Sequence, residues 1–427
     1  MSNSRTVRSK ECYGKYVALR TLVVRSTILF TNFLLILMAL YHLKPASRSL
    51  YLQFHGADNL PYVWIWTALT MMAFLPFYHR LVARFSRFQV VVGTCVTISF
   101  LLILFRLLFI PGGRMVSACF YIFVDIFGVV LVEQFWSLTN SIYNIGEGKR
   151  WYGFIGTGGL IGGVVGGLLS AFIIQKTAIQ TPGLLLVAAL IVFLIAGLTI
   201  WMSRLGLYCE IEGIDEPETE LGGWRALGKS RYLLLIAAML LLAQLASPLI
   251  DYKFLKTVEV YYPEREARTA FLSFLFSMLS LVSIVINLFV TPFIHRLFGA
   301  IGGLLVQPVL MGIFASIFMV QPVLFFAGAL KISDRGISYS IYRASKELLY
   351  VPIDPVLIYQ AKAWIDMFGF RIFKVLGSFL ILLCTQWLPY KLDVSQLSWF
   401  SIGICILWFG LIMVLRLDYR VLYGKYA

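Results

Sequence analysis

Ionisable side chains inside apolar stretches are the residues of this sequence whose types and positions could do chemistry. A charge at the centre of a membrane span costs roughly 2.5–3.5 kcal/mol on insertion scales, and such residues usually face a cavity or a charged partner. The charges at predicted membrane depth are Arg106, Asp125, Glu133, Lys331, Asp334, Arg335, Asp366, Arg371 and Lys374. Their number is typical of a protein that moves a polar solute through a membrane.

Arg371 and Lys374 share one face of a predicted helix, because residues three apart on a helix are neighbours. A basic face inside a helix bundle suits a phosphorylated or otherwise anionic ligand, whose charge offsets the cost of burial. The alternative is that both residues pair with Asp366 and Glu347 for structure alone. Lys346 precedes Glu347 in the same polar stretch.

Asp251 and Lys253 end another apolar stretch, on the side that we expect to face outward. Because they are two residues apart on a helix, they point in different directions and do not neutralise each other locally. They either anchor the helix at the membrane interface or line the outer mouth of the solute path.

Twelve apolar stretches are long enough to carry these charges across a membrane, since a span takes about 20 mostly apolar residues. The chain is 60% hydrophobic and 13% charged, whereas a soluble domain has roughly 25% charged residues. The predicted spans are 27–43, 60–78, 89–110, 115–139, 153–175, 183–202, 231–250, 269–294, 299–319, 322–342, 364–387 and 395–415. The sequence therefore predicts an all-α integral membrane protein embedded in a lipid bilayer.

The net charge of +15 follows membrane topology and leaves little for nucleic acid, since Lys and Arg concentrate in predicted cytoplasmic segments. The six cysteines form no C-x-x-C pair and the four histidines do not cluster, so we expect no metal or other cofactor. The basic segment 1–26 lacks the pattern of a cleavable signal peptide. We expect both termini in the cytoplasm and a monomer in a bacterial inner membrane.

An internal repeat divides the predicted spans into two groups of six. Pro76 to Leu81 recurs as Pro292 to Leu297, about half of the 427-residue chain later, and both copies end a span. Two parallel repeats of six spans are typical of a major-facilitator-like fold, with the substrate at the midplane between the halves. We expect halves at 27–202 and 231–417, an acidic cytoplasmic linker at 203–230 and a C-terminal tail at 418–427.

Two glycine patterns have structural explanations. Gly223 to Ser230 matches the phosphate-binding pattern G-x-x-x-x-G-K-[ST], but that loop works only between a strand and a helix, and here a membrane span follows. The run from Gly153 to Gly167 holds repeated G-x-x-x-G spacings, which let helices approach closely. We expect tight helix packing there, with a part in any rocking of the halves.

Three stretches resemble the ATP/ADP translocase family of plastids and obligate intracellular bacteria. They are Phe135-Trp136 with Asn140 and the run Gly146 to Gly156, then Lys346-Glu347 with Tyr350 to Pro352, then Ala361 to Asp366. The resemblance extends over roughly residues 30–380. It implies a major-facilitator-like fold of twelve spans that exchanges ATP for ADP, or carries other nucleotides.

The resemblance also implies which charges matter, namely a lysine after the first span, acids in the fourth and near the seventh, and a lysine in the eleventh. These places are held by Lys44 with Arg48, Asp125, Asp251 and Lys374. The family's R-D-x-K-D is not reproduced around Lys44, and its G-K-S-G-G reads F-K-V-L-G here.

We therefore predict an alternating-access transporter that exchanges nucleotides such as ATP and ADP, or related phosphorylated anions. The expected substrate-binding residues are Lys44, Arg48, Lys253, Lys346, Arg371 and Lys374. The expected gating or coupling residues are Asp125, Glu133, Asp251, Glu347 and Asp366. One alternative is a proton-coupled carrier of an unrelated solute, with Asp125 or Glu133 as the proton site. Another is a membrane scaffold that moves nothing. An enzyme is not expected, because no catalytic constellation is present.

Overall fold

The computed structural model describes residues 3–423 except 111, 144, 209–227, 229, 351–352, 354–360 and 363. Some side chains within helices also lie outside the described part, including that of Asp366 and those before Thr21. Most of the predicted linker 203–230 and of the segment Gly223 to Ser230 falls outside the described residues as well. Every regular element in the described part is a helix.

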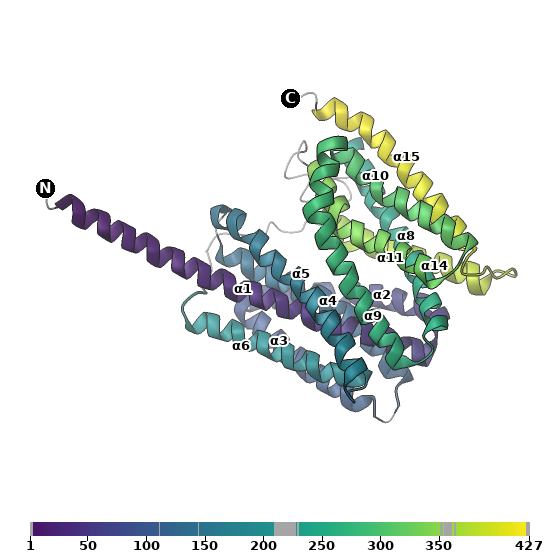
Figure 1. Cartoon of the computed structure of the whole chain (residues 1–427), viewed down its shortest axis with the longest axis horizontal. Helices are drawn as coiled ribbons and strands as arrows, with labels where there is room; N and C mark the ends of the chain where they lie inside the picture. Colours follow the sequence, from purple (N-terminus) through teal and green to yellow (C-terminus); the bar gives the residue numbers. More distant parts are fainter. Residues whose placement is uncertain are drawn as a thin grey trace.

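The N-terminal helices run from the first residues to the predicted linker and appear in purple to teal in Figure 1. They are α1 (Asn3–His55), α2 (Leu60–Arg84), α3 (Arg87–Leu108), α4 (Arg114–Ile142), α5 (Ile145–Lys176) and α6 (Leu184–Arg204), with short 3-10 turns at η1 (Ala57–Asn59) and η2 (Thr181–Gly183). The polar residues between apolar runs end and begin these helices. Ser86, for example, starts α3 by accepting a hydrogen bond from the Gln89 backbone N–H (3.3 Å), while the Gln89 side chain accepts one from Ser86 N–H (3.2 Å).

The C-terminal helices lie beside the N-terminal ones and appear in green to yellow. They are α8 (Arg231–Tyr261), α9 (Arg265–Val285), α10 (Thr291–Val320), α11 (Leu324–Ile337), α12 (Arg343–Tyr350), α14 (Phe370–Leu382) and α15 (Ser398–Tyr423). Short π-helical turns, a type that occurs frequently at functional sites, adjoin these helices: one follows α9, one follows α11, and two flank α14. They are η3 (Ile286–Val290), η4 (Ser338–Tyr342), η5 (Ile365–Gly369) and η6 (Leu383–Trp387).

Among the described residues, nine helical stretches are long and apolar enough to cross a membrane. One of them, Arg265–Val320, covers two of the predicted spans and is broken at Gly299, whose φ of 66° is in the left-handed region. The predicted spans 60–78 and 322–342 lie on α2 and on α11 with η4, which are not among the nine. An all-helical, multi-span membrane protein is thus confirmed, and the total of twelve spans stays a prediction.

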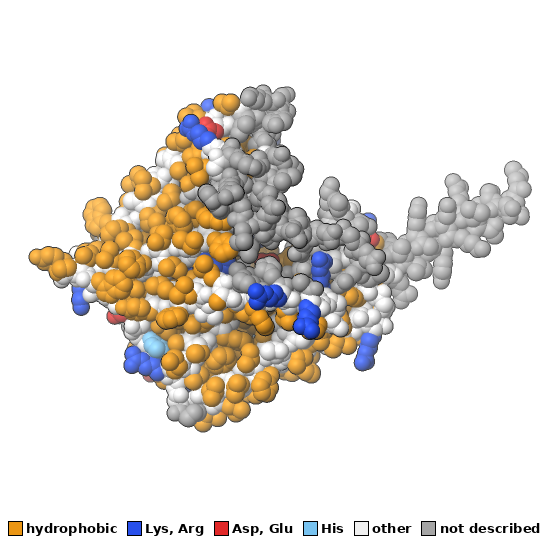
Figure 2. All heavy atoms as spheres, turned by 180° about the vertical axis from the view of Figure 1, so that it is seen from behind, with side chains coloured by type: hydrophobic (Ala, Val, Ile, Leu, Met, Phe, Trp, Pro, Cys, Tyr) orange, Lys and Arg blue, Asp and Glu red, His pale blue; other side chains and the backbone are white. Residues whose placement is uncertain are grey.

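Apolar side chains cover much of the described part of the face shown in Figure 2, which indicates contact with lipid rather than water. Large exposed residues on the spans include Phe100, Leu190, Phe193, Ile406 and Leu407. Inside, one buried apolar cluster lies within α1 to α6, and a second fills α8 to α15 and extends onto the end of α1 and the start of α2. The two halves therefore share their core at that end.

The glycines of α5 pack this helix against α1. A Cβ atom at Gly158, Gly162 or Gly166 would lie closer than 3.0 Å to backbone atoms of α1, a separation that real Cβ atoms do not reach. The three glycines recur every four residues and so form one stripe on α5. Close packing of α5, expected from the G-x-x-x-G spacings, is confirmed.

A second glycine stripe of α5 faces α9 in the other half. A Cβ atom at Gly163 would lie 2.8 Å from Ser280 Oγ, and one at Gly167 would lie 2.6 Å from the carbonyl oxygen of Ser273. Because Gly163 and Gly167 carry no side chain, the α9 serines reach α5, and Ser273 Oγ lies 3.0 Å from Ser170 Oγ. α5 therefore joins the two halves.

Candidate functional site

A buried ion pair joins α1 to α4 inside the N-terminal half. Arg48 Nη2 donates to Asp125 Oδ1 at 2.5 Å, and the guanidinium carbon lies 4.3 Å from the centre of the Tyr121 ring. Pro45, one turn earlier, removes a backbone donor from α1. Ser47 Oγ donates to the Lys44 carbonyl oxygen (2.9 Å) and accepts from Arg48 Nη1 (2.9 Å), which helps to hold Arg48 against Asp125 of α4.

A denser network occupies the C-terminal half. Lys331, Asp334 and Arg335 share one face of α11, because they are spaced at i, i+3 and i+4. Lys331 forms an ion pair with Asp251 of α8, and its Nζ lies 3.7 Å from Asp334 Oδ2. Arg335 approaches the same two acids, with Nη2 3.5 Å from Asp251 Oδ2 and Nε 3.3 Å from Asp334 Oδ2. Two cations therefore share two carboxylates.

Lys44 and Lys374 link these two sets of charges across the halves. Lys44 interacts electrostatically with Arg48, Asp125, Arg335 and Lys374, and its Nζ lies 5.8 Å from the centre of the Phe276 ring of α9. Lys374, on α14, interacts in turn with Asp125, Arg335 and Arg48. Within the described residues neither lysine has a carboxylate within 4.0 Å. We call the whole set the central charge cluster: Lys44, Arg48, Asp125, Asp251, Lys331, Asp334, Arg335 and Lys374.

The central charge cluster holds five cationic and three acidic side chains, so positive charge exceeds negative charge by two. Concentrating like charges away from water is unfavourable unless a counter-charge is present. An anionic ligand with two or more negative charges would supply it. The cluster is therefore chemically suited to an anion. It includes Lys374 of the basic face expected on the predicted span 364–387.

Several expected site residues join this cluster and several do not. Lys44, Arg48, Asp125, Asp251 and Lys374 come together, although they are far apart in the sequence. Lys253 lies elsewhere, fully buried (0% exposed) between α8, α10 and α15, where its Nζ donates to Ser401 Oγ at 2.8 Å and Ser398 Oγ at 3.3 Å. The structure thus separates Lys253 from Asp251.

The remaining expected residues lie on α4, α12 and α14. Glu347 pairs with Lys362 (2.9 Å) and lies 3.9 Å from Lys346. Arg371 lies one turn before Lys374, and Glu133 is an exposed residue two turns after Asp125. Asp366 falls within η5, and its side chain lies outside the described part.

Lys331, Asp334 and Arg335 belong to the site although sequence reasoning did not assign them to it. Their positions inside an apolar stretch mark them as buried charges, and their i, i+3, i+4 spacing places them on one face. The missing information is which helix this face meets. The structure shows that it meets α8 at Asp251 and at Ser247, whose Oγ lies 2.9 Å from Arg335 Nη2.

The two halves are locked together at the end where α1 and α8 finish. Asp58 in η1 accepts hydrogen bonds from Lys256 Nζ (2.8 Å) and Tyr252 OH (2.8 Å) of α8. Glu259 Oε1 accepts from the Ala57 backbone N–H at 3.0 Å, and Gln386 Nε2 donates to the Asp58 carbonyl oxygen at 2.7 Å. Residues 252, 256 and 259 share one face of α8. We call these six residues the Asp58 latch.

Further contacts at this end join the start of α9 to η2 and α1. Glu266 Oε2 accepts from the Thr181 backbone N–H (2.8 Å) and from Thr181 Oγ1 (2.6 Å). Arg268 Nε lies 3.4 Å from Ser49 Oγ. At the opposite end, the described ion pairs stay within one half, as in Arg25–Glu147, Arg231–Asp418 and Lys362–Glu347. In the described part, one end of the bundle is thus closed by contacts between the halves.

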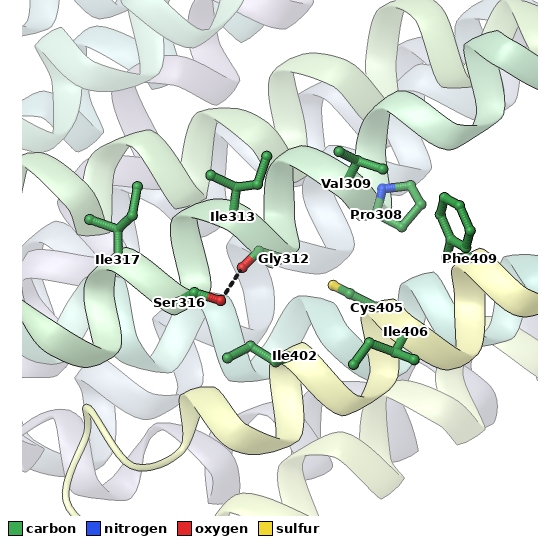
Figure 3. A pocket seen from close by; sticks show the side chains of 10 residues that line it. All are labelled: Pro308, Val309, Gly312, Ile313, Ser316, Ile317, Ile402, Cys405, Ile406 and Phe409. Carbon is green, nitrogen blue, oxygen red and sulfur yellow. Dashed lines mark hydrogen bonds between the residues drawn. The ribbon is translucent and has the colours of Figure 1, made fainter.

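A groove of about 490 Å³ between α10 and α15 offers a contrasting surface. It is lined by Pro308, Val309, Gly312, Ile313, Ser316, Ile317, Ile402, Cys405, Ile406 and Phe409 (Figure 3). Its one hydroxyl, on Ser316, already donates to the Gly312 carbonyl oxygen at 2.9 Å. No ionisable Lys, Arg, Asp or Glu lines it, so it does not suit an anion.

Comparison of the sequence with known proteins finds relatives that are named ADP,ATP carrier proteins. The model of the TLC ATP/ADP transporter family matches residues 113–330 and 312–419. The "ADP,ATP carrier protein 1" of Chlamydia muridarum is 25% identical over 301 residues, which are 61% of this chain and 57% of that carrier. The carrier of the same name from Chlamydia trachomatis serovar D is 23% identical over 394 residues, or 76% and 74% of the two chains. The match thus spans less than two thirds of the first carrier and about three quarters of the second.

Comparison of the structure with solved structures shows the fold. A bacterial homologue of the iron transporter ferroportin, in an inward-facing state, superimposes with a TM-score of 0.66 at 15% identity. The aligned region covers 92% of this chain and 98% of that one. The peptide transporter PepTSo has a TM-score of 0.64 at 11% identity, covering 93% and 98%. A mutant of the nucleoside transporter NupG has a TM-score of 0.62 at 16% identity, covering 92% and 99%. The fold is major-facilitator-like, and with a family model matching most of its length, this chain belongs to the TLC ATP/ADP transporter family, a family of membrane transporters and not of enzymes.

Proposed function

We propose that this transporter exchanges nucleotides such as ATP and ADP, or closely related phosphorylated anions, by alternating access. The observation that carries the proposal is the central charge cluster, in which side chains from both halves meet with an excess of positive charge. The names of the chlamydial relatives support nucleotides as the anion. Phosphate groups carry the charge that this cluster lacks.

Lys44 and Lys374 are the residues that we expect to contact the anion directly. They come from opposite halves, and within the described residues neither is engaged by a carboxylate at ion-pair distance. A ligand phosphate would therefore not have to displace an acidic partner from them. Arg48, beside Lys44, would contribute further positive charge to the binding site. Asp125 and Asp251 would couple anion binding to movement of the halves through the cations with which they form ion pairs.

The contacts between the halves support alternating access around this cluster. Most of the described cross-half hydrogen bonds lie beyond Arg48 along α1, from Ser49–Arg268 to the Asp58 latch, whereas Tyr41–Ser280 (2.8 Å) lies before Lys44. An anion reaching the cluster from the latch side would require the latch to break. With both termini in the cytoplasm, as we expect, the latch faces outward.

Uptake of radiolabelled ATP and ADP by cells expressing the chain tests this proposal. We expect uptake that accelerates when the cells contain unlabelled nucleotide, that survives collapse of the proton gradient, and that Lys374→Gln slows at equal expression and low nucleotide concentration. Arg231→Gln is a matched control, because Arg231 is an exposed cation at the start of α8, away from Asp251 near its other end, and pairs with Asp418. Absence of uptake of any nucleotide would refute the proposal, and sensitivity to the proton gradient would favour a proton-coupled carrier.

A further inference from the structure

We propose that Arg335 is the planar phosphate-binding group of this site, and that Asp251 and Asp334 position its guanidinium without touching the substrate. The proposal rests on the function proposed above and assigns roles within it. It is carried by the geometry of the α11 network, which separates the two α11 cations into a buried one and an accessible one.

Exposure distinguishes these two cations. The Lys331 side chain is 7% exposed and that of Asp334 is 5% exposed, so both lie behind the surface of the cluster. The Arg335 side chain is 31% exposed, although it occupies the same helix face one turn further on. Of the two α11 cations, Arg335 is therefore the one that a solute can reach.

Four oxygen-bearing side chains hold the guanidinium in place, those of Asp334, Asp251, Ser247 and Tyr339. Nε lies 3.3 Å from Asp334 Oδ2, while Nη2 lies 3.5 Å from Asp251 Oδ2 and 2.9 Å from Ser247 Oγ. Contacts at two corners of a planar group fix both its position and the direction of its plane. A guanidinium has five N–H donors, so at least one donor remains for an anion after these four contacts are made.

The position of Arg335 places those donors where positive charge accumulates. Arg335 interacts electrostatically with Lys44 and Arg48 of the N-terminal half and with Lys374 of its own half. A phosphate among these groups would relieve repulsion between cations from both halves at once. The fork of a guanidinium also matches two phosphate oxygens, which the single point charge of a lysine does not.

Asp251 and Asp334 act differently, because a carboxylate repels a phosphate. Each of them lies within ion-pair distance of both Lys331 and Arg335. Asp334, which is 5% exposed, lies behind the cations, and Asp251 is less exposed (20%) than Arg335 (31%), so we expect both acids to influence the anion through Arg335. This assigns to Asp251, which the family resemblance marks as an important acid, a positioning role.

Binding of adenosine, AMP, ADP and ATP to the purified full-length protein, measured by thermal shift and titration, tests this assignment. In the unmodified protein, affinity should rise with the number of phosphates. Arg335→Gln should weaken ATP binding by roughly 10- to 100-fold, since hydrogen bonds to charged groups are worth about 1.5–3 kcal/mol. AMP binding should weaken less, because AMP offers fewer phosphate oxygens. Arg335→Lys should recover only part of the loss, because it restores the charge and not the fork.

The positioning role has its own measurement. Asp251→Asn should weaken ATP binding in the unmodified background and have much less effect in the Arg335→Gln background, because the acid acts through the guanidinium. Arg231→Gln serves as the surface control and should leave every affinity unchanged.

The outcomes separate this assignment from the proposed function. If the unmodified protein binds no nucleotide, the proposed function fails. If it binds ATP and both Arg335→Lys and Arg335→Gln keep the full affinity, the assignment fails alone. If Arg335→Gln does not fold, Arg335→Lys decides, since full ATP affinity in that charge-preserving variant would overturn the role of the planar fork.

Discussion

The two halves of the protein contribute to the central charge cluster in different ways. The N-terminal half has a single ion pair, Arg48–Asp125, with Lys44 beside it. The C-terminal half has a network in which Lys331 and Arg335 share Asp251 and Asp334, with Lys374 beside it. In the N-terminal half Arg48 therefore has one carboxylate partner, whereas in the C-terminal half Lys331 and Arg335 each have two.

Despite this difference, each half leaves one positive charge without a matching negative one. Two cations face one acid in the N-terminal half, and three cations face two acids in the C-terminal half. Neither half alone matches a polyphosphate. A ligand with two or more negative charges would therefore be neutralised only where the halves face each other, which ties binding to their relative position.

The largest expected effect comes from breaking the N-terminal pair. Asp125→Ala leaves Arg48 buried without its carboxylate, and removing one partner of a buried ion pair typically costs about 3–5 kcal/mol of folding stability. Asp251→Ala should cost less, because Lys331 and Arg335 both retain Asp334. Thermal unfolding of both variants in the same detergent measures the difference. Equal losses would show that the two halves do not differ in this way.

Removal of the two lysines should give the next largest effect and should be symmetric. Lys44→Gln and Lys374→Gln each remove the surplus charge of one half, so each should raise the KM for ATP by roughly tenfold or more, as expected for loss of a hydrogen bond to a charged group. Folding stability should change little, since neither lysine holds a carboxylate at ion-pair distance within the described residues. A large effect from one lysine alone would contradict equal contributions from the halves.

The Asp58 latch should control access from its side of the cluster. Lys256→Ala removes the cation that binds Asp58 and also approaches Glu259 at 3.6 Å. Ser49 is fully buried beside Arg268 at this end, so a Ser49→Cys probe reports opening through its reaction with a membrane-impermeant maleimide. We expect labelling several-fold faster with Lys256→Ala than without it. The parent without Ser49→Cys corrects for the exposed Cys119, and an unchanged rate would remove the latch from the gating account.

The smallest effect should come from pH. Burial raises the pKa of Asp58, but hydrogen bonds from Lys256 and Tyr252 together with the charge of Lys256 outweigh it, so the pKa of this carboxyl is lowered. A lowered carboxyl pKa stabilises the closed latch at any pH above the ordinary Asp value of about 3.9, and the stabilisation is lost only as pH falls through the lower pKa. The Ser49→Cys labelling rate should therefore be constant between roughly pH 5 and 8. A rise within that range would contradict this account of Asp58.

Much of the fold follows from single-sequence physics, because the backbone groups of a segment that crosses lipid must bond internally, as they do within each helix here. The apolar stretches and the G-x-x-x-G run predict helices and the packing of α5, and both are found. The number of spans is less certain from sequence where charges interrupt an apolar run, as in α11, whose Lys331, Asp334 and Arg335 lower its hydropathy. Those same charges prove to be part of the site.

Partners across helices are the part that sequence spacing does not predict. The i, i+2 relation separates Asp251 from Lys253 correctly, but it does not reveal that Asp251 meets α11 while Lys253 meets serines of α15. Spacing within one helix determines which residues share a face. Which face meets which helix depends on packing between segments more than a hundred residues apart, as with Lys253 and Ser401.

Exchange by the purified protein in proteoliposomes tests the central claim most directly. Vesicles loaded with ADP would be given radiolabelled ATP, with adenosine, AMP and ADP as competitors and with the proton gradient collapsed. The account predicts uptake that requires internal nucleotide and competition that strengthens from adenosine to ADP as negative charge increases. Uptake that adenosine inhibits as well as ADP does, or no uptake at all, would contradict it.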